Sequence, residues 1–134
     1  MHEARRGIAD DRGSSPVEFV MVGTLLTVLT LAVLQIAVAV YVRNVVHDAA
    51  VEGAYHAALA DTALEEGADR ARLAITRAVG ADYAEDVTAT TTEEPGHAVV
   101  EVRIRTTLPV IGLLGIPYAM EVEAHAPIES LGDE

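Results

Sequence analysis

The chain has 134 residues and a formal net charge of −12, and this length favours one small domain over several. The acidity argues against nucleic acid as a partner, because an acidic surface repels the phosphate backbone. The absence of cysteine excludes disulfides, thiolate chemistry and cysteine-ligated zinc. Apolar residues make up 51% of the chain, with one Phe and no Trp, so any core outside an apolar segment is aliphatic.

The first 60 residues are predicted to form a short leader followed by one long helix. Residues 1–13 are polar and show no apolar period, so we expect a leader there. Ser14 and Pro16 suit a helix start. Residues 19–42 contain no charged side chain, and about 20 apolar residues in a helix cross a bilayer. We therefore predict a helix over residues 14–60 that spans the membrane at 19–42.

The basic residues around the span predict its orientation. Arg5, Arg6 and Arg12 precede it, whereas Arg43 alone follows it closely. The positive-inside rule places such an N-terminus in the cytoplasm. We expect a single-pass membrane protein whose residues 61–134 form an extracytoplasmic α+β domain.

Small residues line one face of the helix beyond the span, and two readings of this stripe remain open. Either the next helix of the same chain packs there, or neighbouring subunits do. The stripe consists of Val45, Val46, Ala49, Ala50, Gly53, Ala54, Ala57 and Ala58.

A second, amphipathic helix follows. Asp61 or Thr62 is expected to cap it, because Thr62 and Glu65 have the spacing of a capping box. Gly80 is placed to end it. The expected apolar face comprises Leu64, Ala68, Ala71, Ile75 and Ala78.

Beyond Gly80 the apolar period changes to two, which is typical of strands with one wet face. Strands are expected at residues 86–92, 97–108 and 118–126, with a turn at 93–96. The predicted fold class is α+β: a transmembrane helix, an amphipathic helix and a three-stranded antiparallel sheet that covers that helix. The expected inward side chains are Val100, Val102, Ile104, Thr106, Met120, Val122 and Ala124, and the outward ones are Glu101, Arg103, Arg105, Glu121, Glu123 and His125.

The stretch between the last two strands, residues 108–117, is apolar but interrupted by Gly and Pro. We interpret it as a loop. A loop this apolar should not face water, so it is expected to pack under the sheet, or to touch the bilayer or a partner.

The string R-G-S-S-P-V-E-F-V-M-V, with basic residues before it and an uncharged run after it, resembles the type IV prepilin processing site, which a membrane aspartyl peptidase cuts after Gly. Over roughly residues 11–60 the chain is similar to the TadE-like family, pseudopilins of tight-adherence pilus assembly systems. The resemblance implies a type IV pilin-like fold, processing at Gly13 and Ser14, and an assembly role for Glu18. It implies as partners membrane lipid, the prepilin peptidase, and other pilin-like subunits or pilus platform proteins.

A cut after Gly13 would expose the α-amine of Ser14, and Glu18 is the fifth residue from that new terminus. A carboxylate near the hydrocarbon edge favours a neutralising partner, so the amine of one subunit could meet Glu18 of a neighbour and set the axial register of a filament.

Other readings stay open at this point. The chain could be a signal-anchored envelope protein that presents a small binding domain, with Glu18 merely in the first helical turn, where the dipole favours acids. A signal peptidase could instead cut after the A-x-A pattern at residues 37–39. The pattern does not distinguish a filament subunit from an initiator or a platform component.

Chemistry-bearing motifs are sparse. Asp48, Glu52 and His56 share a helix face and could hold a metal, but a solvated polar stripe is the preferred reading. The sequence has no G-x-S-x-G, no H-E-x-x-H and no phosphate-binding glycine loop. We therefore expect a non-enzymatic protein without catalytic residues, bound metal or cofactor.

Overall fold

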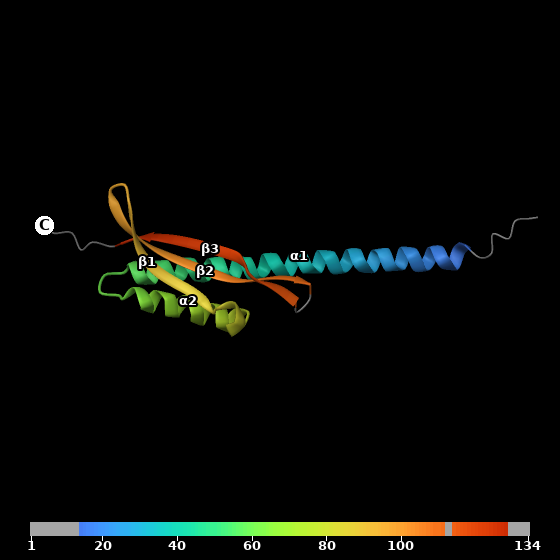
Figure 1. Cartoon of the computed structure of the whole chain (residues 1–134), viewed down its shortest axis with the longest axis horizontal. Coiled ribbons are helices and arrows are strands. Elements are labelled where there is room, and N and C mark those ends of the chain that lie inside the picture. Colours follow the sequence, from blue (N-terminus) through green and yellow to red (C-terminus); the bar gives the residue numbers. More distant parts are fainter. Residues whose placement is uncertain (1–13, 112–113, 129–134) are drawn as a thin grey trace, which may run out of the picture. The chain divides into compact units, whose positions relative to one another are not determined.

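The computed structural model describes residues 14–111 and 114–128. The fold is α+β, as the sequence predicts: a long apolar helix, a second helix and a three-stranded antiparallel sheet in the order β1-β2-β3 (Figure 1). The elements are α1 (Ser14–Ala58), α2 (Leu64–Ala78), the 3₁₀ turn η1 (Ala81–Tyr83), β1 (Asp86–Glu94), β2 (His97–Ile111) and β3 (Leu114–Pro127).

The chain divides into two units, residues 1–34 and residues 35–134. In the first, the described part of α1 exposes apolar side chains on all sides. The hydroxyls of Thr24, Thr27 and Thr30 each donate to the carbonyl four residues earlier, at 2.8 Å. These threonines therefore satisfy their polar groups within the helix, which suits an apolar solvent. Among the described residues, α1 is the one helix long and apolar enough to cross a membrane.

The second unit has one apolar core, to which α1, α2 and the sheet contribute side chains. The small-residue stripe of α1 is buried apart from the half-buried Val45, and it shares one apolar core with α2 and the inner face of the sheet. A Cβ placed on Gly53 would lie 2.7 Å from the carbonyl oxygen of Gly67 in α2. The stripe therefore packs within its own chain, and the reading in which neighbouring subunits occupy it is wrong.

The faces of the sheet are as predicted. Val100, Val102 and Ile104 of β2 are buried, and so are their inward-facing partners on β3. On the outer face, Arg103 Nη2 lies 2.8 Å from Glu123 and Arg105 Nε lies 3.2 Å from Glu121. These cross-strand pairs are half exposed, so each contributes less than about 1 kcal/mol.

One polar side chain enters the core. Thr106 continues the inward-facing row of β2 and is buried, and its hydroxyl has no hydrogen-bond partner among the described residues. An unsatisfied buried hydroxyl costs about 1–3 kcal/mol, so Thr106 opposes the stability that its apolar neighbours supply.

The predicted capping box of the second helix is wrong. The N-cap of α2 is Ala63, without a side-chain cap. The chain turns at Asp61, where φ is 65°, and the helix begins too late for Thr62 to cap it. Glu65 instead pairs with Arg72 at 3.0 Å.

The C-terminal end of α2 confirms the role of Gly80, which adopts a φ of 113° and donates its N–H to the carbonyl of Ile75 at 3.3 Å. Ala78, which was predicted on the apolar face, is exposed because it is the last residue of the helix.

The predicted loop at residues 108–117 is also wrong. β2 and β3 continue through most of it. Thr106 pairs with Met120, and after a register shift Leu108 pairs with Ile116. Residues 112–113 lie outside the described part of the chain. β1 pairs with β2 only as far as Arg105, so beyond that point both strands of the hairpin have a free edge. Free edges tolerate proline, which is why the two prolines of this stretch do not end the strands.

The first hairpin is tighter than expected. β1 runs to Glu94, and only Pro95 and Gly96 form the turn, with Gly96 at a φ of 100°. A glycine is favoured there because residues with a Cβ rarely adopt positive φ.

Candidate functional site

The N-terminal end of α1 carries the residues that the sequence singles out. Gly13 lies outside the described residues. The helix begins at Ser14, the residue that a cut after Gly13 would make N-terminal. Glu18 is exposed and lies in the second turn, and the first turn of α1 contains no acid. The alternative in which Glu18 sits in the first turn to complement the helix dipole is therefore wrong.

Glu18 is surrounded along the helix by exposed apolar side chains. Val17 precedes it, and Phe19, which is 79% exposed, begins the charge-free run. Glu18 lies four positions after Ser14, which corresponds to about 6 Å along the helix axis. The arrangement places a carboxylate at the end of a lipid-compatible surface.

A second group of ionisable side chains lies on the outer face of the sheet. Ligand atoms of Glu101, Glu123 and His125 lie within 4.8 Å of one another. Arg103 already pairs with both carboxylates, at 2.9 Å to Glu101 and 2.8 Å to Glu123. The two carboxylates thus share one arginine, which offsets part of their negative charge.

Sequence reasoning did not single out this cluster. The pairing of β2 with β3 places Glu101 opposite His125, and the alternation of residues within each strand does not specify that pairing. The sequence had instead suggested Asp48, Glu52 and His56 as possible ligands. Within the described residues these three do not form a comparable group, and Glu52 pairs with Arg70 at 2.8 Å.

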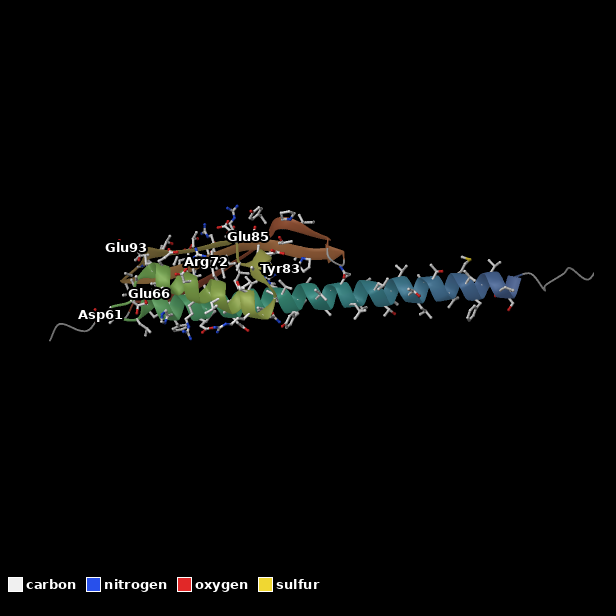
Figure 2. All side chains as sticks on the ribbon, turned by 90° about the horizontal axis from the view of Figure 1, so that it is seen from below. Asp61, Glu66, Arg72, Tyr83, Glu85 and Glu93 are labelled. Atoms are coloured by element: carbon white, nitrogen blue, oxygen red, sulfur yellow. The ribbon has the colours of Figure 1, made fainter. Side chains whose placement is uncertain are left out.

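Arg72 joins α2 to the sheet and has a structural role. Figure 2 labels its side chain on α2. Its Nη2 donates to the carbonyl of Val87 in β1 at 2.7 Å, and its Nη1 pairs with Glu65 and Asp69. The hydrogen bond to Glu65 raises the pKa of the Arg72 guanidinium above its ordinary value. The charge that holds β1 against α2 is therefore permanent.

Comparison with known proteins gives a match to a protein family. The family model described as TadE-like protein matches residues 13–54, which begins at Gly13 and covers Ser14, Glu18 and the apolar run. No curated protein and no solved structure matches the chain.

The matched segment coincides with α1 over nearly its whole length. TadE-like proteins are pilus-associated and generally non-enzymatic. The match and the long apolar helix together support a membrane-anchored protein. The segment that forms the N-terminal helix is thus similar to the TadE-like family, which is associated with the Tad pilus.

Proposed function

We propose that the protein is a minor pilin-like subunit, a pseudopilin, in the assembly of a tight-adherence pilus, and that it is processed after Gly13. The observation that carries this proposal is the position of Glu18, an exposed carboxylate at the N-terminal end of the apolar run of α1, within the segment that matches the family. Its proposed partners are membrane lipid, the prepilin peptidase, and other pilin-like subunits or platform proteins.

In this function α1 has two tasks in succession along its length. Residues 19–42 hold the subunit in the membrane, with the leader in the cytoplasm and residues 61–134 outside. After processing, the α-amine of Ser14 in one subunit meets Glu18 of the next. Opposite charges about 4 Å apart attract by about 4 kcal/mol at an effective dielectric constant of 20, before the cost of desolvation, which favours one axial register over others.

The mature N-terminus distinguishes the proposal from its alternatives. We expect the protein from a host with an active tight-adherence system to begin at Ser14, and to begin at Met1 when the prepilin peptidase is deleted. Intact-mass measurement of the purified protein separates these forms. A terminus at Val40 would indicate signal peptidase, and a terminus at Met1 in both hosts would favour a signal-anchored binding protein.

Removing the charge of Glu18 is expected to block assembly while leaving the anchor in place. Glu18→Ala and Glu18→Gln should reduce surface pili by at least about tenfold, which corresponds to about 1.4 kcal/mol, while the amount of protein in the membrane fraction stays unchanged. Glu18→Asp, which keeps the charge, should retain part of the assembly. Pili are counted by electron microscopy and sheared-filament immunoblots.

Asp48→Ala provides the matched control, since Asp48 is an exposed acid on the same helix beyond the charge-free run. It should assemble normally. Normal pili from Glu18→Ala, with the mature N-terminus still at Ser14, would contradict the proposed pairing between the α-amine of Ser14 and Glu18 of the next subunit.

A further inference from the structure

The hairpin of β2 and β3 has a sharp boundary between charged and uncharged residues. Residues 106–120 contain no charged side chain, and Arg105 and Glu121 flank them. The register places these two residues opposite each other, with Arg105 Nε 3.2 Å from Glu121. The charged residues of both strands therefore end at the same paired position, and the connecting residues 106–120 are uncharged.

Helix α1 has its own boundary at Arg43, the first charged residue after the run at 19–42. As a helix this run is about 36 Å long, slightly more than the ~30 Å hydrocarbon core. Its last residues therefore reach the interface between lipid and water.

The two boundaries meet in the second unit. One shallow hollow is lined by Ala39, Val40 and Arg43 from α1 and by Leu108, Ala119, Met120 and Glu121 from the hairpin. Arg43 and Glu121 thus mark the same level on two elements. The uncharged end of the hairpin lies beside the last turn of the predicted span (Figure 1).

Apolar and aromatic side chains are exposed at this level. Ile116 is 54% exposed and Tyr118 is 59% exposed on β3, and Tyr41 is 55% exposed on α1. Tyrosine is enriched where membrane meets water, because its ring prefers lipid and its hydroxyl prefers water. The opposite end of the sheet, at Glu93 and Glu94, is exposed and charged, so the two ends suit different solvents.

We infer that Ile116 and Tyr118, the exposed side chains of β3 at the uncharged end of the β2–β3 hairpin, make a second membrane contact in the outer headgroup region beside α1. The occupant of this surface is lipid, because the surface is continuous with the membrane-spanning helix and shares its charge boundary. The hairpin does not enter the hydrocarbon core, since its strands have free backbone edges that lipid cannot satisfy. The contact fixes the folded unit against the bilayer instead of leaving it on a flexible tether.

Fluorescence quenching by lipid tests this contact, and the absence of native cysteine makes single-site labelling straightforward. The full-length Ile116→Cys variant is labelled with bimane. It is then reconstituted into vesicles of phosphatidylcholine and phosphatidylglycerol that contain lipids with a nitroxide near the headgroup, and a parallel set of vesicles carries the nitroxide deep in the acyl chain to report on positions inside the predicted span. We expect quenching several-fold stronger than for Thr91→Cys, an exposed position on β1 near the charged end of the sheet.

Val28→Cys, within the predicted span, separates the possible failures, because the inference rests on the membrane anchor of the proposed function and not on pilus assembly. Quenching at Val28→Cys without quenching at Ile116→Cys would overturn the hairpin contact and leave the anchor intact. Loss of quenching at both positions would overturn the anchor as well. Disulfide-linked dimers of unlabelled Ile116→Cys, with no quenching of the labelled protein, would show that a second copy covers the hairpin, which also overturns the inference.

Discussion

Replacing Gly67 with alanine is expected to destabilise the folded unit by about 2 kcal/mol or more. A Cβ at this position would lie 2.5 Å from the carbonyl oxygen of Gly53 and would also collide with the Cβ of Ala57. Both obstacles are rigid, so α1 and α2 would have to separate. Overpacking typically costs about 1–3 kcal/mol, and a backbone obstacle places the cost at the upper end, which outweighs the roughly 1 kcal/mol that alanine gains over glycine in a helix.

The measurement is urea-dependent hydrogen exchange at the amides of β2, in the full-length protein in detergent micelles. Gly23→Ala is the matched control, because the same substitution in α1 meets nothing within 4 Å. It should leave the exchange of β2 unchanged. Equal stability of Gly67→Ala and the unaltered protein would mean that the helices do not approach as closely as Gly53 and Gly67 indicate.

This close approach shows where sequence reasoning stops. The small-residue stripe of α1 predicts that another backbone comes near, since small side chains leave room for it. It does not say which backbone. That answer depends on Gly67 of α2, which faces Gly53 only after the chain reverses at Asp61, and no local pattern fixes the angle of that reversal.

The strands could be predicted where apolar and charged residues alternate. The prediction failed where the composition suggested a loop although the strands pair. Val100, Val102 and Ile104 alternate with charged residues, so the inner face could be identified directly. In residues 108–117, Gly and Pro suggest a loop. The strands continue nevertheless, because a free edge tolerates proline. The edge of β2 is free there because β1 pairs with it only as far as Arg105, and the local sequence does not show this.

The candidate site divides in the same way. Ser14 and Glu18 could be recognised because their relation is a spacing along one helix. The grouping of Glu101, Glu123 and His125 on the sheet could not, because it depends on the register between β2 and β3. The bulge near Tyr118, where φ is 55°, likewise leaves no signal in the order of residues.

Ile104→Ala is expected to have the largest effect on stability, about 2–5 kcal/mol. Ile104 is fully buried in the central strand, and the register places it between Val87 of β1 and Val122 of β3, both of them buried. Truncation would leave a cavity in the middle of this row. The sheet cannot close around it, because the cross-strand hydrogen bonds fix the spacing of the three strands. A small domain with a total stability of about 5–15 kcal/mol would lose a large part of it.

The same exchange measurement on β2 tests this prediction, and Ile116→Ala is its matched control. Ile116 is the same residue type in the neighbouring strand, but more than half of it is exposed, so truncation in micelles should cost less than about 1 kcal/mol. The pair separates two roles of isoleucine in one hairpin, since Ile104 stabilises the fold whereas Ile116 is assigned to the membrane surface. Similar losses from both variants would contradict this division, because they would place Ile116 in the core of the folded unit.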